Sequence, residues 1–531
     1  MEPTPGRLRR ELGLVQVTAS GVGIIIGAGV YVLVGAAAGK AGAAVWVGFL
    51  VAGVLSVLTA LSYCELASMF PSAGAEFDYA RRVFPAWVAF VVGWIMIVGL
   101  VVAAGAVSLG FGRYLRHFVD VPEQVGAIGL LVSVTAVALL GIRQSAVVTL
   151  VFSVVQVGGL VMVAAVGAPR LGDHSLLEGG SVTGVVSAAA LVFFAFIGFD
   201  EVITLSDETR DPVSTVPRAL LLALLISTAL YAAVAVASVS VLGAAALADA
   251  PQPLAAVMAT ALGDRSADVV ALIALVATTN TTLLLLTASS RLSYGMAERG
   301  ALPLGAARVS ARGVPWIPLL IAATVAAAGV VLGNLALIAS VTDFAVYLVF
   351  VAVNVVVIVL RFRQPHRLRP FRVPLAVGRV PLPTVAALVV VLVMLPGLEP
   401  KALLLGVALI AVGLMVHLAV RRWVPAESVH VQPRGDNGAM ARTRVTADEA
   451  AAALAALHVD LATVTWDLEQ FRRGMESELA HGRVDPDTNV TDDDLVLTGK
   501  IALAHLVEIP DYYTRLAAME AEAFAEQERH R

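Results

Sequence analysis

Long apolar runs separated by short charged segments fill the first 424 positions of the chain. A helix of about 20 apolar residues spans the roughly 30 Å hydrocarbon core of a bilayer. On that rule we predict twelve membrane-spanning helices, with ends placed to within about 2–4 residues. They lie near residues 14–36, 42–66, 86–112, 124–141, 145–167, 182–206, 218–243, 267–290, 315–332, 336–360, 382–397 and 401–420. The eleventh run is short, so eleven spans remain an alternative.

The pattern changes in the last quarter of the chain. Residues 425–445 are polar and contain Gly and Pro, which predicts a linker. Thr446-Ala-Asp-Glu449 matches a capping box that opens an Ala- and Leu-rich helix. Further helical patterns follow near residues 460–481, 492–508 and 510–528. We therefore expect a membrane domain over 1–424 and a small cytosolic helical domain over 446–531.

Composition supports this division. The chain is 59% hydrophobic and 14% charged, whereas a soluble domain has about 25% charged residues and about half apolar ones. Soluble enzymes, disordered scaffolds and disulfide-stapled secreted domains are excluded for most of the chain. The single cysteine, Cys64, cannot form an internal disulfide or a multi-cysteine metal site. We expect no cofactor and no nucleic-acid partner, and a lipid bilayer as the surroundings.

Charge distribution predicts the orientation. Residues 426–531 hold 20 acidic and 10 basic residues, which leaves 20 acidic and 26 basic residues for the membrane part. With the N-terminus inside, the inner segments carry 20 Lys and Arg against 6 in the outer segments. Basic residues concentrate on the cytoplasmic side of membrane proteins. Both termini are therefore expected in the cytoplasm, with the chain in the cytoplasmic (inner) membrane.

Two spans carry signs of a broken helix. The first contains four glycines, Gly21, Gly23, Gly27 and Gly29, and each disfavours helix by about 1 kcal/mol relative to Ala. The sixth contains Gly198 followed by two carboxylates, Asp200 and Glu201. The alternatives are close helix packing through small residues in the first span and snorkelling carboxylates at the end of the sixth. Interrupted spans at matched positions of two halves favour an inverted repeat with a substrate site near the bilayer midplane, and hence a solute transporter.

Several motifs in order along the chain are similar to those of a known family. They are Gly23-Ile-Ile-Ile-Gly-Ala-Gly-Val-Tyr31, Ala60-Leu-Ser-Tyr-Cys-Glu-Leu-Ala-Ser-Met-Phe-Pro-Ser-Ala-Gly74, Phe194-Ala-Phe-Ile-Gly-Phe-Asp200, Asp207-Glu-Thr-Arg-Asp-Pro212, Ser290-Arg-Leu-Ser-Tyr-Gly-Met-Ala-Glu-Arg-Gly300 and Arg369-Pro-Phe-Arg-Val-Pro374. Through them, residues 13–424 resemble the amino acid–polyamine–organocation (APC) permeases, and most closely the cationic amino acid transporter-like branch.

The resemblance implies an all-α polytopic fold and a binding site. It implies a five-plus-five inverted-repeat (LeuT-like) core, with repeats at about 13–167 and 182–360, two further helices, and alternating access. The amides of Gly27, Ala28 and Gly29 would hold the substrate carboxylate, and carbonyls near Ile25, Phe194 and Ile197 the α-ammonium, around the break at Gly198. Phe194 or Phe196 would form an aromatic gate, and Asp200 would take part in gating or proton linkage. Unpaired N–H groups do bind anions, and unwound carbonyls do bind cations.

Span five departs from the pattern of proton-coupled relatives. Those proteins carry a lysine at the position of Gln156, and a glutamine has no titratable group in the working range. The chain is then a uniporter or an exchanger, or it couples to protons through another group such as Asp200. The alternative is that Gln156 only forms a hydrogen bond between helices.

Other polar residues lie within or beside the spans. Glu65 is expected at the inner end of span two as a structural partner for nearby arginines. For Asp343 the favoured interpretation is an interfacial helix cap, and the alternative is a substrate ligand. The polar cluster Thr278-Thr-Asn-Thr-Thr282 either bonds between helices or lines the pathway.

The C-terminal part contains the motifs Gly474-Met-Glu-Ser-Glu-Leu-Ala-His-Gly482, Thr488-Asn-Val-Thr-Asp-Asp-Asp494, Thr498-Gly-Lys-Ile-Ala-Leu-Ala-His-Leu506 and Glu508-Ile-Pro-Asp-Tyr-Tyr513. Through them, about residues 465–525 resemble a small bacterial helical domain of unknown function. The pairs Glu478–His481 and His505–Glu508 place a carboxylate and an imidazole three residues apart on a helix face, as in carboxylate-bridged metal bundles. The alternative is that these side chains pair with one another across a helical hairpin.

We therefore predict an amino acid transporter, with neutral and cationic amino acids equally open as cargo and polyamines disfavoured. An amino acid-sensing receptor that signals through the C-terminal domain is the alternative. A membrane enzyme is disfavoured because the spans contain no nucleophile–base pair. The oligomeric state is left open.

Overall fold

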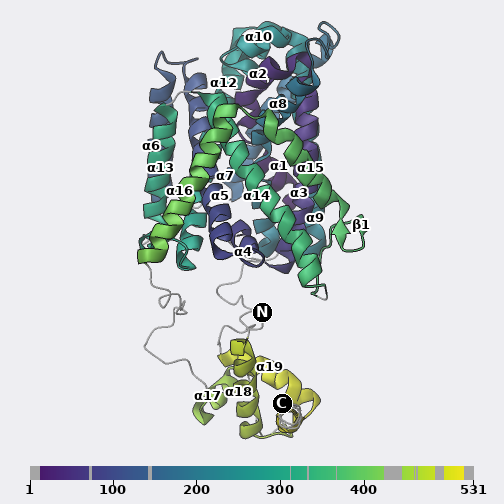
Figure 1. Ribbon diagram of the computed structural model, residues 1–531, viewed down its shortest axis with the longest axis vertical. Helices are drawn as coiled ribbons and strands as arrows, with labels where there is room; N and C mark the ends of the chain where they lie inside the picture. Colours follow the sequence, from purple (N-terminus) through teal and green to yellow (C-terminus); the bar gives the residue numbers. More distant parts are fainter. Residues whose placement is uncertain are drawn as a thin grey trace. The chain divides into compact units, whose positions relative to one another are not determined.

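The computed structural model describes residues 12–70, 75–141, 146–310, 312–331, 334–365, 367–423, 445–457, 459, 461, 464–484 and 495–519. The chain forms two compact units, residues 1–431 and 432–531. Figure 1 shows the helices of both.

The first unit is a bundle of helices that run roughly side by side (Figure 1). Its α-helices are α1 (Leu14–Ile25), α2 (Gly29–Ala41), α3 (Val45–Met69), α4 (Ala75–Arg81), α5 (Ala86–Leu115), α6 (Glu123–Leu139), α7 (Ala146–Gly167), α8 (Val182–Val192), α9 (Pro212–Leu242), α10 (Ala244–Asp249), α11 (Pro253–Leu262), α12 (Asp264–Glu298), α13 (Trp316–Val331), α14 (Leu335–Arg363), α15 (Leu382–Met394) and α16 (Pro400–Trp423). Short 3-10 helices are η1 (Gly42–Ala44), η2 (Ala168–Arg170), η3 (Phe193–Phe196), η4 (Phe199–Glu208), η5 (Leu304–Ala307) and η6 (Leu395–Gly397).

Length and apolar composition make this unit a polytopic membrane protein. Within the described residues, eight helical segments are long and apolar enough to cross a bilayer, and five shorter apolar helices accompany them. Helices α5 and α14 are the most enclosed, each with 72% of its most apolar stretch buried, whereas α16 has only 17% buried. Apolar side chains on the outer helices, such as Leu404 and Val407 of α16, are exposed. Such a surface suits lipid acyl chains rather than water.

One strand pair interrupts the helical architecture. Between α14 and α15, β1 (Ala376–Val377) and β2 (Val380–Pro381) form an antiparallel hairpin. The sequence pattern predicts only helices, because a hairpin of two-residue strands is too short to leave an alternating pattern.

The second unit has its own apolar core. Helices α17 (Ala447–Ala456), α18 (Leu468–Val484) and α19 (Leu495–Glu508) pack around Leu454, Phe471, Met475 and Leu506. The capping box predicted at Thr446 is confirmed, because the Thr446 hydroxyl accepts the Glu449 N–H and the Glu449 carboxylate accepts the Thr446 N–H. The predicted linker lies outside the described residues except for Val445, as does the end of the predicted last helix beyond residue 519.

Candidate functional site

The helix of the first predicted span is interrupted at the position that its glycines indicated. Helix α1 ends at Ile25, the chain turns through residues 26–28, and α2 begins at Gly29. The first backbone hydrogen bond of α2 runs from Val32 N–H to Ala28 C=O, over 3.2 Å. The backbone N–H groups of Gly29 and of the two residues after it therefore have no acceptor within α2, as is the case at every helix N-terminus.

The sixth span is broken as well. Helix α8 gives way to η3, and the chain then turns at Ile197 and Gly198 before η4. Gly198 has φ +106°, a conformation that side chains with a Cβ rarely adopt. A glycine at this position is therefore required by the turn itself.

The two breaks touch one another. A Cβ added to Gly29 would lie only 2.5 Å from Cα of Ala195 in η3, so the two backbones meet at a point that only glycine permits. The hydroxyl of Tyr231, on α9, lies 2.9 Å from the Ile25 carbonyl oxygen and 3.0 Å from that of Ala195. One buried phenol therefore joins the end of α1 to the interrupted sixth span.

Two of the amides predicted to bind the substrate carboxylate have hydrogen-bond partners within the protein. Gly27 N–H donates to Ile25 C=O over 2.9 Å, and Ala28 N–H donates to Thr281 Oγ1 on α12 over 3.1 Å. A Cβ on Gly27 would lie 2.8 Å from the same Thr281 hydroxyl. Of the polar cluster at 278–282, Thr281 bonds to another helix, whereas Thr278, Thr279 and Thr282 bond to carbonyls of α12 itself.

The predicted aromatic gate residues lie on η3. Phe194 and Phe196 are both buried, and the Phe196 ring packs edge-on against Tyr231 with 5.2 Å between centroids. Their neighbour Phe193 packs on Tyr347 and Phe350 of α14. The aromatic side chains of η3 therefore connect the break to two neighbouring helices.

Gln156 is buried on α7, beside the first break. The backbone carbonyl oxygen of Gln156 accepts a hydrogen bond from the Tyr31 hydroxyl over 2.6 Å, which connects α7 to α2. Within the described part of the chain, its side-chain amide has no hydrogen-bond partner. The contact between helices that the structure shows at Gln156 therefore uses the backbone and not the side chain, and the role of the side chain stays a prediction. An unpaired buried amide costs about 1–3 kcal/mol.

Acidic residues lie at the start of η4 and on α4. Asp200 is half-buried at the start of η4. Glu76 of α4 is 6% exposed and accepts the Tyr63 hydroxyl over 3.2 Å. Burial, with the negative charge of Asp200 added, raises the pKa of Glu76 to about 8. Asp78, on the same helix, pairs with Arg299 at the end of α12 over 2.7 Å.

The helix-cap interpretation of Asp343 is wrong. Helix α14 is capped by Asn334, whose side chain accepts the Leu337 N–H over 3.0 Å. Asp343 therefore lies inside the helix, and it is fully buried. Neither carboxylate oxygen has a hydrogen-bond partner among the described residues. A buried intramembrane carboxylate of this kind is costly and usually functional.

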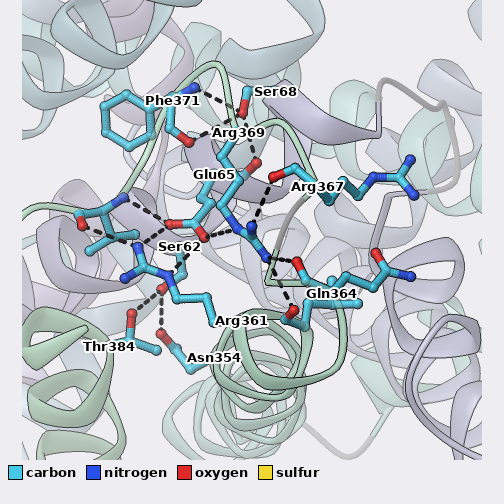
Figure 2. A network of polar contacts seen from close by, with 12 residues as sticks. Ser62, Glu65, Ser68, Asn354, Arg361, Gln364, Arg367, Arg369, Phe371 and Thr384 are labelled. Carbon is cyan, nitrogen blue, oxygen red and sulfur yellow. Dashed lines mark hydrogen bonds and ion pairs between the residues drawn. The ribbon is translucent and has the colours of Figure 1, made fainter. Parts of the chain in front are cut away.

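Glu65 pairs with arginines, as predicted. Figure 2 shows its carboxylate between the guanidinium groups of Arg361 and Arg369. The Arg361 Nε–Oε1 distance is 2.9 Å, the Arg369 Nε–Oε1 distance is 3.2 Å, and the Val373 N–H donates to Oε2 over 2.8 Å. The cluster binds the end of α3 to α14 and to the segment that follows α14.

The metal-site hypothesis for the C-terminal unit gains no support. Glu478 Oε1 lies 3.8 Å from His505 Nε2 and accepts the Tyr513 hydroxyl over 2.9 Å, so two of the candidates pair across α18 and α19. Glu508 is exposed, and the side chain of His481 lies outside the described residues. The described residues contain no group of three His, Cys, Asp or Glu side chains placed to hold a metal.

Comparisons with known proteins agree with this architecture. Residues 12–419 match the family model described as amino acid permease, and residues 450–522 match a family described as a protein of unknown function. The branched-chain amino acid permease of Bacillus subtilis is 30% identical over 69% of this chain and 84% of its own length.

Two further relatives are also transporters. An uncharacterized transporter of Mycobacterium tuberculosis is 37% identical over 61% of this chain and 74% of its own length. The vacuolar cationic amino acid transporter 4 of Arabidopsis thaliana is 31% identical over 68% of this chain and 65% of its own. These relatives are named as transporters and not as enzymes, and the chain belongs to the amino acid permease family of the APC superfamily.

Proposed function

We propose that this protein moves amino acids across the cytoplasmic membrane by alternating access, with the substrate held between the two broken spans. The observation that carries the proposal is the contact of the two breaks, where Gly29 meets Ala195 and Tyr231 joins Ile25 to Ala195. Irregular backbone at membrane depth is tolerated where it lines a cavity, and such sites bind the charged ends of small solutes.

The substrate carboxylate binds the amides of Gly27, Ala28 and Gly29, at the positive end of the α2 dipole. The α-ammonium binds carbonyls at Ile25, Phe194 and Ile197. The hydroxyls of Thr281 and Tyr231 satisfy part of this set in the structure. Substrate binding therefore exchanges a neutral hydroxyl partner for a charged one, and charge-assisted hydrogen bonds are about twice as strong as neutral ones.

Phe194 or Phe196 closes the site as it turns with η3, and Asp200 and Gln156 act in gating and coupling. Because Gln156 does not titrate, the protein works as a uniporter or exchanger, or it takes up a proton through Asp200. The electrostatic interaction of Asp200 with the buried Glu76, a group of the same charge, supports the second route.

The proposal includes a domain plan. We propose twelve spans in residues 1–424, with α1 and α2 together forming the first and α8 to η4 the sixth. Repeats of five cover about 13–167 and 182–360. Both termini lie in the cytoplasm, and residues 446–531 form a cytosolic domain after a linker at 425–445. The 20 to 6 distribution of basic residues supports this orientation.

Counterflow in proteoliposomes tests the proposal. Purified protein is reconstituted, and vesicles loaded with leucine, lysine, glutamate or putrescine are given trace radiolabelled substrate, with and without a pH gradient. We expect counterflow with at least one α-amino acid and none with putrescine, which has no carboxylate for the amides. Saturable binding of an amino acid without counterflow would support the receptor alternative and overturn the transporter.

A further inference from the structure

The segment that joins α14 to α15 is strongly basic. From Arg361 to Leu398 the sequence contains no acidic residue. Six arginines stand in its first half, at 361, 363, 367, 369, 372 and 379. The single carboxylate of Glu65 pairs with two of them, Arg361 and Arg369. A net positive charge therefore remains on the part of the segment that faces outward.

Three of the six arginines are exposed, at 363, 372 and 379. Arg363 donates to the Val83 carbonyl oxygen over 3.2 Å, whereas within the described residues Arg372 and Arg379 pair with no carboxylate. Arg379 lies in the turn of the hairpin, beside Gly378, whose φ of +62° is required by a two-residue hairpin loop.

Exposed apolar side chains are interleaved with these charges. Leu368 is 87% exposed, Leu375 74% and Val377 68%. All three lie outside the helices that span the membrane. On a span, an exposed leucine contacts acyl chains, whereas on this segment it would face water unless the segment lies on a bilayer. Figure 1 shows the hairpin, labelled β1, projecting sideways from the flank of the bundle near its lower end.

We propose that the segment between α14 and α15, which the structure describes at residues 364–365 and 367–381, is an interfacial anchor that binds anionic phospholipid headgroups. The guanidinium groups of Arg372 and Arg379 bind lipid phosphates, for which a planar bidentate donor is well suited. Leu368, Leu375 and Val377 enter the boundary between headgroups and acyl chains, as the apolar face of an interfacial element does. The inference needs only that the first unit spans a membrane, and it does not depend on the substrate or on transport.

The anchor also has a structural consequence. The segment begins where α14 ends, and Val373 within it donates to the buried Glu65 carboxylate. Lipid binding at the hairpin is therefore connected through one short stretch of chain to the junction of α3 and α14.

Depth measurement by spin labelling tests the anchor. Cys64 is buried and is the only cysteine of the sequence, so Cys64→Ser provides a clean background for a nitroxide at Val377→Cys. Leu177→Cys is the matched control, because Leu177 is 65% exposed in a loop that also contains Glu178. The full chain is placed in bilayers of phosphatidylcholine alone, or with phosphatidylglycerol added. Accessibility to oxygen and to a water-soluble nickel complex is then compared.

We expect the label at position 377 to be shielded from nickel and open to oxygen when phosphatidylglycerol is present, and the label at 177 to stay open to nickel. Equal nickel accessibility at both positions in the anionic bilayer would overturn the anchor. Shielding of position 377 to the same degree in pure phosphatidylcholine would overturn the requirement for anionic lipid.

A charge variant provides the second measurement. Arg372→Gln with Arg379→Gln removes two contacts, each worth about fivefold in affinity at an anionic surface. The variant should therefore need about 25-fold more phosphatidylglycerol to reach the same number of bound lipids, counted by native mass spectrometry. Arg170→Gln with Arg265→Gln makes the same charge change elsewhere and should have little effect. A thermal melt checks that both variants are folded. Equal losses in the two pairs, or no loss in the first, would contradict the proposal.

Discussion

The side chain of Thr281 accepts the backbone N–H of Ala28 over 3.1 Å, although the two residues are 253 positions apart in the chain. Helix α12 therefore supplies a hydroxyl to the gap in the first span. The same amide is one of three that we propose to bind the substrate carboxylate. Thr281 is thus the residue whose contact a bound amino acid must replace.

Thr281→Val tests this competition. The variant keeps the side-chain shape but leaves the Ala28 amide unpaired, which should destabilise the free protein by about 1–3 kcal/mol. A substrate carboxylate restores a partner, so the rise in melting temperature caused by substrate should be larger than in the wild type. Thr279→Val is the control, because that hydroxyl bonds only to Leu275 of its own helix. Equal behaviour of the two variants would argue against Thr281 as a competitor.

Tyr231→Phe separates the hydroxyl from the ring. The ring contacts with Phe196 and Phe49 remain, while the bonds to the Ile25 and Ala195 carbonyls are lost. We expect a stability loss of about 1 kcal/mol and a several-fold change in the apparent KM for uptake. Tyr347→Phe, which loses a bond to Ala190, should lower stability without changing KM. An unchanged KM in Tyr231→Phe would remove this residue from the site.

Gly29→Ala tests the contact of the two breaks. The added Cβ would lie 2.5 Å from a backbone atom of Ala195, which cannot move as a flexible side chain can. Overpacking of this kind costs about 1–3 kcal/mol, and we expect uptake to be lost. Gly158→Ala on α7 is the control, because no atom lies within 4 Å of its added Cβ. Uptake by Gly29→Ala at the wild-type rate would show that the breaks can separate freely.

The glycine breaks and the partners of Glu65 could be predicted from the sequence because their causes are local. Glycine weakens a helix wherever it stands, and a carboxylate within a span needs a cationic partner. Thr281 and Tyr231 could not be predicted, because their roles depend on which distant helices pack together. Asp343 was misassigned although the predicted start of its span, residue 336, lies one residue from the observed start of α14 at Leu335. Position 343 is about two turns inside that helix, and its burial depends on which distant helices pack around it.

Glu65→Gln should be the most destabilising of these variants. It leaves Arg361 and Arg369 buried without a counter-charge, and breaking a buried pair in this way costs about 3–5 kcal/mol. Glu123→Gln breaks the partly exposed pair with Arg113 and should cost no more than about 1 kcal/mol. Denaturation in detergent micelles measures both. A loss below 1 kcal/mol for Glu65→Gln would mean that the arginines find other partners.

The raised pKa of Glu76 predicts that the stability of the folded protein depends on pH. Its pKa is raised to about 8 in the folded protein, so the folded state holds a proton that the unfolded chain releases near its ordinary value of 4.5. The protonated Glu76 therefore contributes to the free energy of unfolding, and this contribution is fully present below pH 4.5 and is lost as the pH rises toward 8. The melting temperature should therefore fall across that range, with a shallower fall in Glu76→Gln. Glu178→Gln, at an exposed position, should follow the wild type; an identical slope in Glu76→Gln would contradict the assignment.

Protection of a cysteine at the break by substrate tests the central claim most directly. In the Cys64→Ser background, the half-buried Ile197 is replaced by cysteine, and its reaction rate with a small maleimide is measured in proteoliposomes against Leu177→Cys. We predict that an amino acid found active in counterflow slows labelling at 197 in a saturable manner, with half-effect near its transport KM, and leaves labelling at 177 unchanged. An unchanged rate at position 197 under saturating substrate, in vesicles that still transport, would place the binding site elsewhere.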